Sequence, residues 1–330
     1  MPPPETALER AEELAERALS DRRPKRRMLV IVNPYATTVS DRLKNLVVYA
    51  LQGRYSVEAV DTQARAHATE LCREAAREGY EIVVAFGGDG TVNEAANGLA
   101  GSDTPLTVLP GGSTNVFCRA LGVPNDVVDA TEHILGMADR FQPRRVDLGR
   151  AGARHFTFGA GVGLDASVVE RVDRRPWLKA RYGPWFYTYA ALAVFNRRYL
   201  VSPPRIRVET KDRTAEGVTL IVQNLDPYTY FGRRPISISH GAHNIDGQLA
   251  AALLRRATPL EIPTLIGRIF LGGPGSVLRH RQVEGFDRLK GLKVVSVGDV
   301  PFPLQVDGDF IGEFDEMTFG VTPAALTVVS

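Results

Sequence analysis

Three apolar runs, each followed by turn-forming residues, constrain the fold of this chain most strongly. They are MLVIVNP from Met28, EIVVAFGG from Glu81 and LTVLPGG from Leu106, with helical patterns at 40–51, 66–77 and 92–99. Strands that are apolar throughout are buried on both faces, which is typical of a parallel sheet covered by helices. The sequence therefore predicts an α/β domain with a parallel sheet over residues 25–145.

The pattern changes after residue 145. Short alternating segments such as PRIRVET, GVTLIVQN, LKVVSV and FPLQVDG are joined by turns, with helical patterns at 164–172, 185–196 and 262–270. Alternation of this kind indicates mostly antiparallel strands. We expect a β-rich second domain over residues 146–318, with a return of the last residues to the first domain as an option. Residues 1–24 are expected to form a helical arm.

Composition narrows the class of protein. The chain has 330 residues, of which 44% are hydrophobic and 24% charged, as expected of a globular protein with two domains. The net charge of +2 and two cysteines predict a cytoplasmic protein without a nucleic-acid partner. No apolar run approaches the ~20 residues of a membrane span, so any membrane contact is expected to be peripheral.

The segment FGGDGTVNE (86–94) carries the strongest chemical signal. Gly87, Gly88 and Gly90 let the backbone approach a ligand closely, and the start of the following helix favours an anion. A carboxylate beside phosphates, here Asp89, implies an intervening metal ion or a role as proton acceptor. The alternative is a tight turn in which Asp89 only caps a helix.

A second turn, LPGGSTNVF (109–117), follows the next strand. Its two glycines free the backbone, while Ser113, Thr114 and Asn115 offer hydrogen bonds. Two such turns on consecutive parallel strands would face one crevice, which suits a polyanion, although a capped helix explains the second turn alone. The chain lacks the GxxxxGK[ST] motif. A GxGxxA match at 161–166 lacks the expected acidic residue further on, so we interpret it as a closely packed strand–helix turn.

The segments GGDGTVNEAANGL and LPGGSTN at this spacing resemble the diacylglycerol kinase catalytic-domain family, which includes bacterial lipid kinases and is related to sphingosine and ceramide kinases. Further similar segments are VNP at 32–34, Thr62 with His67 and Ala68, GAGVGLDASVV, NIDGQL and QVDGDF. The resemblance implies a diacylglycerol-kinase-like or NAD-kinase-like α/β domain, a β-sandwich domain and an active site between them. It also implies ATP, Mg²⁺ and a lipid acceptor, most simply diacylglycerol giving phosphatidic acid in phospholipid biosynthesis.

The resemblance also implies residue roles. Asp307 is expected to be the general base and Asp89 to serve Mg²⁺–ATP, with Asp89 open as the alternative base. Asp246 is expected to bind a structural metal ion, although Asp-Gly pairs at 246 and 307 are equally typical of hairpin turns. Nucleotide contacts are expected at Asn33, Thr62, Gly87, Gly88, Asp89, Gly90, Thr91, Glu94, Gly112, Ser113, Thr114, Asn115 and Asp309. The chain departs from the family where Tyr35-Ala36-Thr37 replaces the usual xSG and Asp309 replaces the last glutamate.

Residues 171–199 mix aromatic and basic side chains, a combination that suits an anionic membrane surface but also a core helix with solvated flanks. A lipid substrate, peripheral membrane contact and, by resemblance, a homodimer are the expected partners. The alternatives are a sphingoid-type lipid kinase, an NAD kinase and a nucleotide- or lipid-binding protein without turnover. The LPGGSTN turn argues against the NAD kinase.

Overall fold

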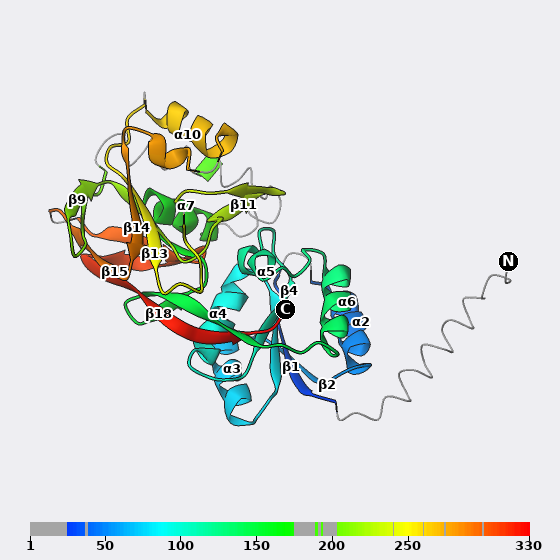
Figure 1. Cartoon of the computed structure of the whole chain (residues 1–330). Coiled ribbons are helices and arrows are strands. Elements are labelled where there is room, and N and C mark those ends of the chain that lie inside the picture. Colours follow the sequence, from blue (N-terminus) through cyan, green and yellow to red (C-terminus); the bar gives the residue numbers. More distant parts are fainter. Residues whose placement is uncertain are drawn as a thin grey trace.

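The computed structural model describes residues 25–36, 39–174, 189–190, 193, 203–239, 241–259, 261–273, 275–298 and 300–330. Two domains lie one above the other in Figure 1, and the red strand β18 runs from one into the other. The expected arm at 1–24 and most of the basic–aromatic segment at 171–199 lie outside the described residues.

The first domain contains the predicted parallel sheet. Its strands are β1 (Arg27–Val32), β2 (Ser56–Asp61), β3 (Ile82–Gly87) and β4 (Leu106–Pro110). They pair in the order β2-β1-β3-β4, and each pair is parallel. The three apolar runs form β1, β3 and β4, which are buried almost throughout, whereas β2 is the exposed edge strand. The fully apolar pattern thus correctly indicated strands covered on both faces.

Helices cover both faces of this sheet. The pair α3 (His67–Arg77) and α4 (Asp89–Leu99) lies on one face, and α2 (Asp41–Gln52) with α6 (Val127–Met137) lies on the other (Figure 1). The helix α4 begins three residues before the expected Val92. Gly88 is extended and acts as the N-cap residue, so Asp89, Gly90 and Thr91 form the first helical turn. A short helix, α5 (Val116–Ala120), follows β4.

The second domain is a sandwich of antiparallel strands. Six strands pair in the order β14-β13-β10-β7-β16-β17. They are β7 (Gly159–Gly163), β10 (Thr219–Gln223), β13 (Leu249–Leu254), β14 (Val283–Leu289), β16 (Phe302–Val306) and β17 (Asp309–Phe314). The helices α7 (Leu164–Asp173) and α10 (Ile262–Leu271) agree with the expected ranges. A hairpin of β11 (Thr229–Phe231) and β12 (Arg234–Ile236) and a short 3₁₀ helix, η2 (Val277–Arg279), complete this side.

The last strand, β18 (Glu316–Val328), belongs to both domains. Near its end Val328 pairs in parallel with Leu106 of β4, and its first half pairs antiparallel with β15 (Gly291–Ser296). The sheet of the first domain therefore continues through β18 and β15 into β8 (Ile206–Glu209) and β9 (Thr214–Gly217). The strands β5 (Arg144–Ala151) and β6 (Arg154–Phe156) join the same sheet, because β5 pairs with β18.

Each domain has its own hydrophobic core. The first core contains Phe86 and Phe117, and Leu326 of β18 lies in it. The second core contains Phe286 and Phe302 of the six-stranded sheet together with Phe319 of β18, which confirms the expected sandwich. Within the described ranges, no helix has the length and apolar character needed to cross a bilayer.

Candidate active site

The carboxyl ends of the parallel strands bring together residues that are distant in sequence. The backbone N–H of Asn33, after β1, donates to the carbonyl of Phe86 at 2.9 Å, and its Nδ2 donates to Thr91 Oγ1 at 3.1 Å. The N–H of Thr62, after β2, donates to the Val32 carbonyl at 2.8 Å. Asn33 is therefore tied directly to the GGDGT segment, and Thr62 lies at the next strand end.

The two glycine turns are in direct backbone contact. The Gly111 N–H donates to the Gly87 carbonyl at 2.8 Å. A Cβ atom at Gly111 would lie 2.8 Å from the Gly87 Cα, and one at Gly112 would lie 3.0 Å from the Gly88 Cα. Contacts below 3.0 Å force the backbone apart, so glycine is required at 111 for the turns to form one continuous surface.

The carboxylate of Asp89 joins the two turns. Thr114 Oγ1 donates to its Oδ2 at 2.9 Å, and the N–H of Val116, at the start of α5, donates to Oδ1 at 2.7 Å. Burial raises the pKa of Asp89 to about 6, because desolvation outweighs the hydrogen bond from Thr114, and the charge of Asp307 raises it further. The carboxylate thus caps α5, and with this raised pKa it ionises at a higher pH than an ordinary aspartate.

Asn115 makes the LPGGSTN turn rigid. It adopts a left-handed conformation with φ of 47°, its Oδ1 accepts from Gly112 N–H at 2.9 Å, and its Nδ2 donates to the Gly112 carbonyl at 2.8 Å. The same amide donates to Asn125 Oδ1 at 2.8 Å. Asn115 is buried, whereas Ser113 is exposed between these anchors. Of these two predicted contacts, only Ser113 presents its side chain to solvent.

Glu94 shapes the rim of the site. Its two carboxylate oxygens accept hydrogen bonds from the N–H groups of Ala66 at 2.9 Å and Ala68 at 3.2 Å. Ala66 is the N-cap residue of α3 and has no capping side chain of its own. Glu94 therefore caps α3 from α4 and fixes the loop after β2, while its contact with a nucleotide stays a prediction.

Asp307 directly follows β16 at the predicted Asp-Gly turn, and its carboxylate is surrounded by donors. Oδ2 accepts from the Thr157 N–H and hydroxyl and from Asn93 Nδ2, at 2.6, 2.9 and 2.8 Å. Oδ1 accepts from the N–H groups of Phe158 and Gly159 at 3.1 and 3.0 Å. These five donors exceed the roughly four lone-pair directions of a carboxylate. The residue is 2% exposed, and these contacts hold the Asp-Gly turn in place, while its role as general base stays a prediction.

Asp309, two residues further on, faces the first domain. A Cβ atom at Gly90 would lie 3.2 Å from each carboxylate oxygen of Asp309, which places this carboxylate against the first turn of α4. Its Oδ2 is 3.4 Å from an Arg154 guanidinium nitrogen, and its side chain is 38% exposed. A carboxylate of the second domain therefore reaches the GGDGT segment, and it is that of Asp309.

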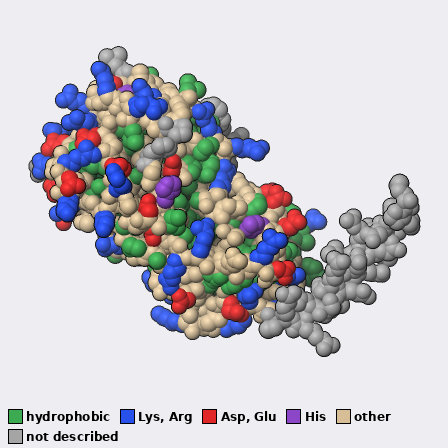
Figure 2. All heavy atoms as spheres, viewed as in Figure 1, with side chains coloured by type: hydrophobic (Ala, Val, Ile, Leu, Met, Phe, Trp, Pro, Cys, Tyr) green, Lys and Arg blue, Asp and Glu red, His purple; other side chains and the backbone are tan. Residues whose placement is uncertain are grey.

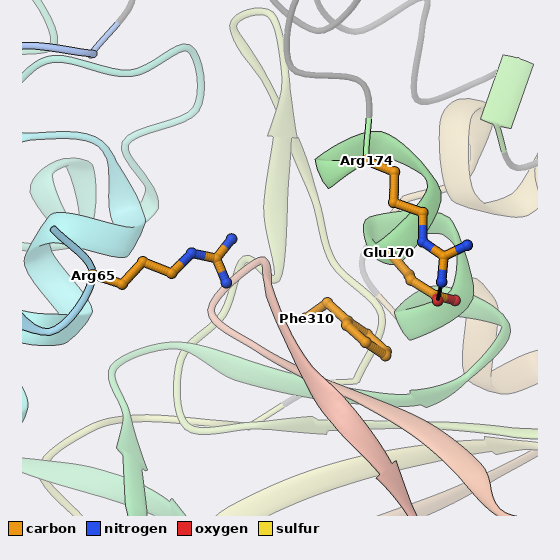
Figure 3. Close-up of a pocket in the computed structure, with 4 residues that line it drawn as sticks. All are labelled: Arg65, Glu170, Arg174 and Phe310. Carbon is orange, nitrogen blue, oxygen red and sulfur yellow. Dashed lines mark hydrogen bonds and ion pairs between the residues drawn. The ribbon is translucent and has the colours of Figure 1, made fainter.

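A cleft lies between the domains, and the residue that follows Asp309 in β17 contributes to its lining. It encloses about 220 Å³ and is lined by Arg65, Glu170, Arg174 and Phe310. Figure 3 shows Arg65 reaching in from the first domain, opposite Phe310 of β17 and the α7 residues Glu170 and Arg174. Arg174 donates to Glu170 at 2.6 Å. The cleft thus has one wall from each domain, and its aromatic side chain belongs to the residue that follows Asp309 in sequence.

Two family models together cover nearly all of the chain from β1 onward. The diacylglycerol kinase catalytic domain matches residues 27–151, and the YegS C-terminal NAD kinase beta sandwich-like domain matches residues 159–330. The chain belongs to the diacylglycerol kinase catalytic-domain family. The enzyme class that the resemblance implied, a lipid kinase, is confirmed.

Individual relatives agree with this membership. A diacylglycerol kinase of Staphylococcus aureus is 26% identical over 295 residues, covering 88% of each chain. An uncharacterised Synechocystis protein is also 26% identical, over 86% of this chain, which spans only 65% of that protein's length. A crystal structure of a diacylglycerol kinase from Bacillus anthracis is 23% identical with a TM-score of 0.69, covering 92% of this chain and 96% of that one. This last likeness shows the shared fold.

The residues of this kinase-family site fit ATP with Mg²⁺. The N-cap residue of α4 is Gly88, which has no side chain to cap the helix. A helix N-terminus whose N–H groups are uncapped favours phosphate. Asp89 lies in this first turn, and a carboxylate and phosphates share such a place through a cation. Asp89 is the side chain that would hold Mg²⁺, which commonly takes one or two carboxylates plus phosphate oxygens.

The predicted metal ligand Asp246 lies elsewhere. It is exposed, and its Oδ1 accepts from the Gln248 N–H at 3.0 Å in a local turn. The buried Asp147 holds this loop by accepting from the Gly247 N–H at 2.7 Å, and it accepts from Ala324 N–H at 2.7 Å. Across the part of the chain that the structure describes, no three His, Cys, Asp or Glu side chains group closely enough for a metal ion. The role of Asp246 stays a prediction.

Several site residues escaped the sequence analysis. Arg154 donates to Asn93 Oδ1 at 2.8 Å and links α4 to Asp309. Asn93 lies four residues after Asp89 in the same motif, and this position is the signal from which the sequence could have indicated it as a site residue. A second network joins Asp165, Tyr228 and Gln305: the tyrosine hydroxyl and the Gln305 amide each donate to Asp165 Oδ2 at 2.7 Å.

This second network supports the Asp-Gly turn. The other end of the Gln305 amide accepts from the Gly308 N–H at 2.8 Å. A Cβ atom at Gly161 would lie 2.0 Å from Asp165 Oδ2, so the GxGxxA segment is a closely packed strand–helix turn, as interpreted from the sequence. Burial raises the pKa of Asp165, while hydrogen bonds from Tyr228 and Gln305 oppose the shift. The segment thus positions the turn that carries Asp309.

Proposed function

We propose that this lipid kinase transfers the γ-phosphoryl group of ATP to the free hydroxyl of diacylglycerol, giving phosphatidic acid. The observation that carries the proposal is the Asp309 carboxylate of the second domain, which lies against the first turn of α4. The next residue in the chain, Phe310, lines an interdomain cleft. Phosphoryl transfer needs held phosphates, charge neutralisation and an acceptor for the hydroxyl proton, and this arrangement offers a group for each.

The glycine turns and the start of α4 would hold the phosphates through backbone N–H groups. Asp89 would keep the two turns in register, since its oxygens already bind Thr114 and Val116. Mg²⁺, when bound, would neutralise the developing charge on the transferred group. Asp309 would accept the hydroxyl proton, because its side chain is half-exposed, whereas Asp307 is saturated with donors.

The lipid hydroxyl would enter from the cleft beside Phe310. A diacylglycerol molecule keeps its chains in a bilayer, so the reaction would occur at the membrane surface, on the cytoplasmic side where ATP is available. Peripheral association with anionic lipid, and a homodimer as in the resemblance, belong to this proposal.

The test is transfer of label from γ-labelled ATP to a panel of diacylglycerol, sphingosine, ceramide and NAD. We expect Mg²⁺-dependent label in diacylglycerol alone. Label in a sphingoid base or in NAD would show that this molecule, and not diacylglycerol, is the acceptor. Binding of ATP without label in any acceptor would favour a protein without turnover.

A further inference from the structure

The helix α10 is apolar on nearly every side, yet it lies on the surface of the second domain. Its sequence IPTLIGRIFL contains a single charged residue, Arg268, and none of its residues is fully buried. Ile266 is 42% exposed and Leu271 is 83% exposed. A helix that is hydrophobic all round is ordinarily buried in protein or lipid.

One side of α10 is used for packing within the domain. Leu265, Ile269 and Phe270 are partly buried against a cluster that includes Tyr228 and Ile236. The Phe270 ring meets Phe231 of the β11–β12 hairpin edge to face, with centroids 5.5 Å apart. Helix and hairpin are therefore held side by side, and α10 lies at the end of the molecule farthest from the first domain (Figure 1).

The surroundings of α10 are basic. Residues 228–281 contain seven arginines but only two acidic residues, Asp246 and Glu261. Glu261 is buried and paired with Arg281 and His280. The exposed arginines are Arg233, Arg234, Arg255, Arg256, Arg279 and Arg281. Figure 2 shows Lys and Arg gathered with hydrophobic side chains over this end of the second domain.

We propose that α10 and the β11–β12 hairpin form a docking face for the surface of an anionic bilayer. We define the docking face by Ile266 and Leu271, which would enter the interface, and by Arg233, Arg234 and Arg279, which would meet lipid phosphates. An exposed apolar helix bordered by arginines is the combination that binds such surfaces, because apolar burial and attraction to anionic lipid add.

The docking face is connected to the active site. Arg119 of α5 donates to the hairpin carbonyl of Gly232 at 3.2 Å, and its guanidinium stacks 4.3 Å from the Tyr230 ring centroid. Asp89, in turn, caps the start of α5. Docking through the hairpin would therefore set the orientation of the cleft toward the bilayer. This role in catalysis rests on the proposed function, whereas the docking itself does not.

A label at position 271 tests the docking. Cys72 and Cys118 are both buried, so Leu271→Cys adds the accessible thiol for an environment-sensitive fluorophore. Tyr49→Cys is the matched control, because Tyr49 is 78% exposed on α2 of the first domain. With phosphatidylglycerol vesicles, we expect a blue-shifted, brighter emission at 271 and no change at 49, with the effect weakened by phosphatidylcholine alone or by salt. Emission at 271 that ignores vesicles, or is already blue-shifted without them because the chain's own residues 175–202 or a second copy cover α10, overturns the proposal.

Substitutions provide the second measurement. Ile266→Asp with Leu271→Asp, and separately Arg233→Glu with Arg234→Glu, should each lower binding to anionic vesicles about tenfold or more, while Tyr49→Asp should not. Thermal unfolding checks that the variants remain folded. Folded variants that co-sediment like the wild type overturn the proposal.

Activity assays separate this inference from the proposed function. Docking variants should keep wild-type turnover on a short-chain diacylglycerol dispersed as monomers, and lose it on diacylglycerol embedded in anionic vesicles. If the wild type phosphorylates neither form, the proposed function fails, while a vesicle response at position 271 still supports docking. Equal turnover of variant and wild type on embedded substrate argues against a catalytic role for the face.

Discussion

The site contains three aspartates, which have the same kind of side chain but lie in three different environments. Asp307 is buried under five donors, Asp89 bridges the two glycine turns, and Asp309 is half-exposed against α4. A carboxylate whose lone pairs are all occupied stabilises a turn, whereas one whose side chain is partly exposed can be reached by a substrate. We therefore expect the chemical role of each aspartate to follow its environment.

Asp309→Asn should lower turnover by ~10²–10⁴-fold, the usual contribution of a general base, with little change in ATP affinity or stability. Asp307→Asn should instead destabilise the fold by about 1–3 kcal/mol, because the amide NH₂ would face N–H donors. Steady-state kinetics and thermal unfolding of both variants measure this. If Asp307→Asn is as stable as the wild type but has no turnover, Asp307 and not Asp309 is the general base.

The pKa of Asp89 predicts a pH dependence. Because burial raises it to about 6, the carboxylate ionises only above that pH, and kcat/KM should rise through about pH 6 and then level off. Asp89→Asn should lose more than nine-tenths of the turnover, equivalent to over ~1.4 kcal/mol, and should lack this limb. The pH profiles of kcat/KM for the wild type and for Asp89→Asn test this prediction. If the variant shows the same rise near pH 6, another group is responsible for the rise.

The same shift affects stability with the opposite sign. The folded pKa lies above the ordinary value of 3.8, so the folded state binds more protons between that pH and about 6. The contribution of Asp89 to the free energy of unfolding is therefore present at low pH and is lost as pH rises through this window.

At the scale of elements, the site is two strand–turn–helix units in contact. The helices α4 and α5 start at neighbouring strand ends, and the distance between them is set by glycines that touch. The phosphate-binding surface therefore depends on backbone contact between the units as well as on side chains.

Gly111→Ala should separate these units, since its Cβ would lie 2.8 Å from the Gly87 Cα. Overpacking of this kind costs typically ~1–3 kcal/mol, and ATP affinity should fall as well. Gly136→Ala is the control: nothing lies within 4 Å of its Cβ position in α6, and alanine favours a helix by about 1 kcal/mol. Chemical denaturation and ATP binding measure both, and an unperturbed Gly111→Ala would contradict the close contact.

At the scale of the molecule, β18 joins the two domains. Phe319 lies in the second core, while Leu326, seven positions later on the same strand, lies in the first. Loss of either domain's packing would free one half of β18, so the two cores should unfold together.

Leu326→Ala should cost ~2–5 kcal/mol and Phe319→Ala ~3–5 kcal/mol, each lowering the temperature of one shared unfolding transition. Leu46→Ala, on the exposed face of α2, is the matched control and should change stability by less than about 0.5 kcal/mol. Calorimetry checks this. Two separated transitions, with each variant shifting a different one, would show that the domains unfold independently.

Local pattern was sufficient for the elements and for the family. Three apolar runs became β1, β3 and β4 because strands buried on both faces need apolar side chains at every position. The amphipathic or apolar segments at 164–172 and 262–270 became α7 and α10 within one residue at each end. Glycines at strand ends indicated an anion site, since that property belongs to the backbone of the segment itself.

Tertiary structure decided which of the two neighbouring aspartates is buried, and it decided the path of β18. Asp307 and Asp309 are two residues apart in one Asp-Gly-Asp segment, and the donors around Asp307 come from positions 93 and 157–159. Asp307 adopts a left-handed conformation, with φ of 47°, in the turn between the two aspartates. Which aspartate is buried thus depends on donors distant in sequence, because a hydrogen bond requires proximity in space, which the local pattern does not contain.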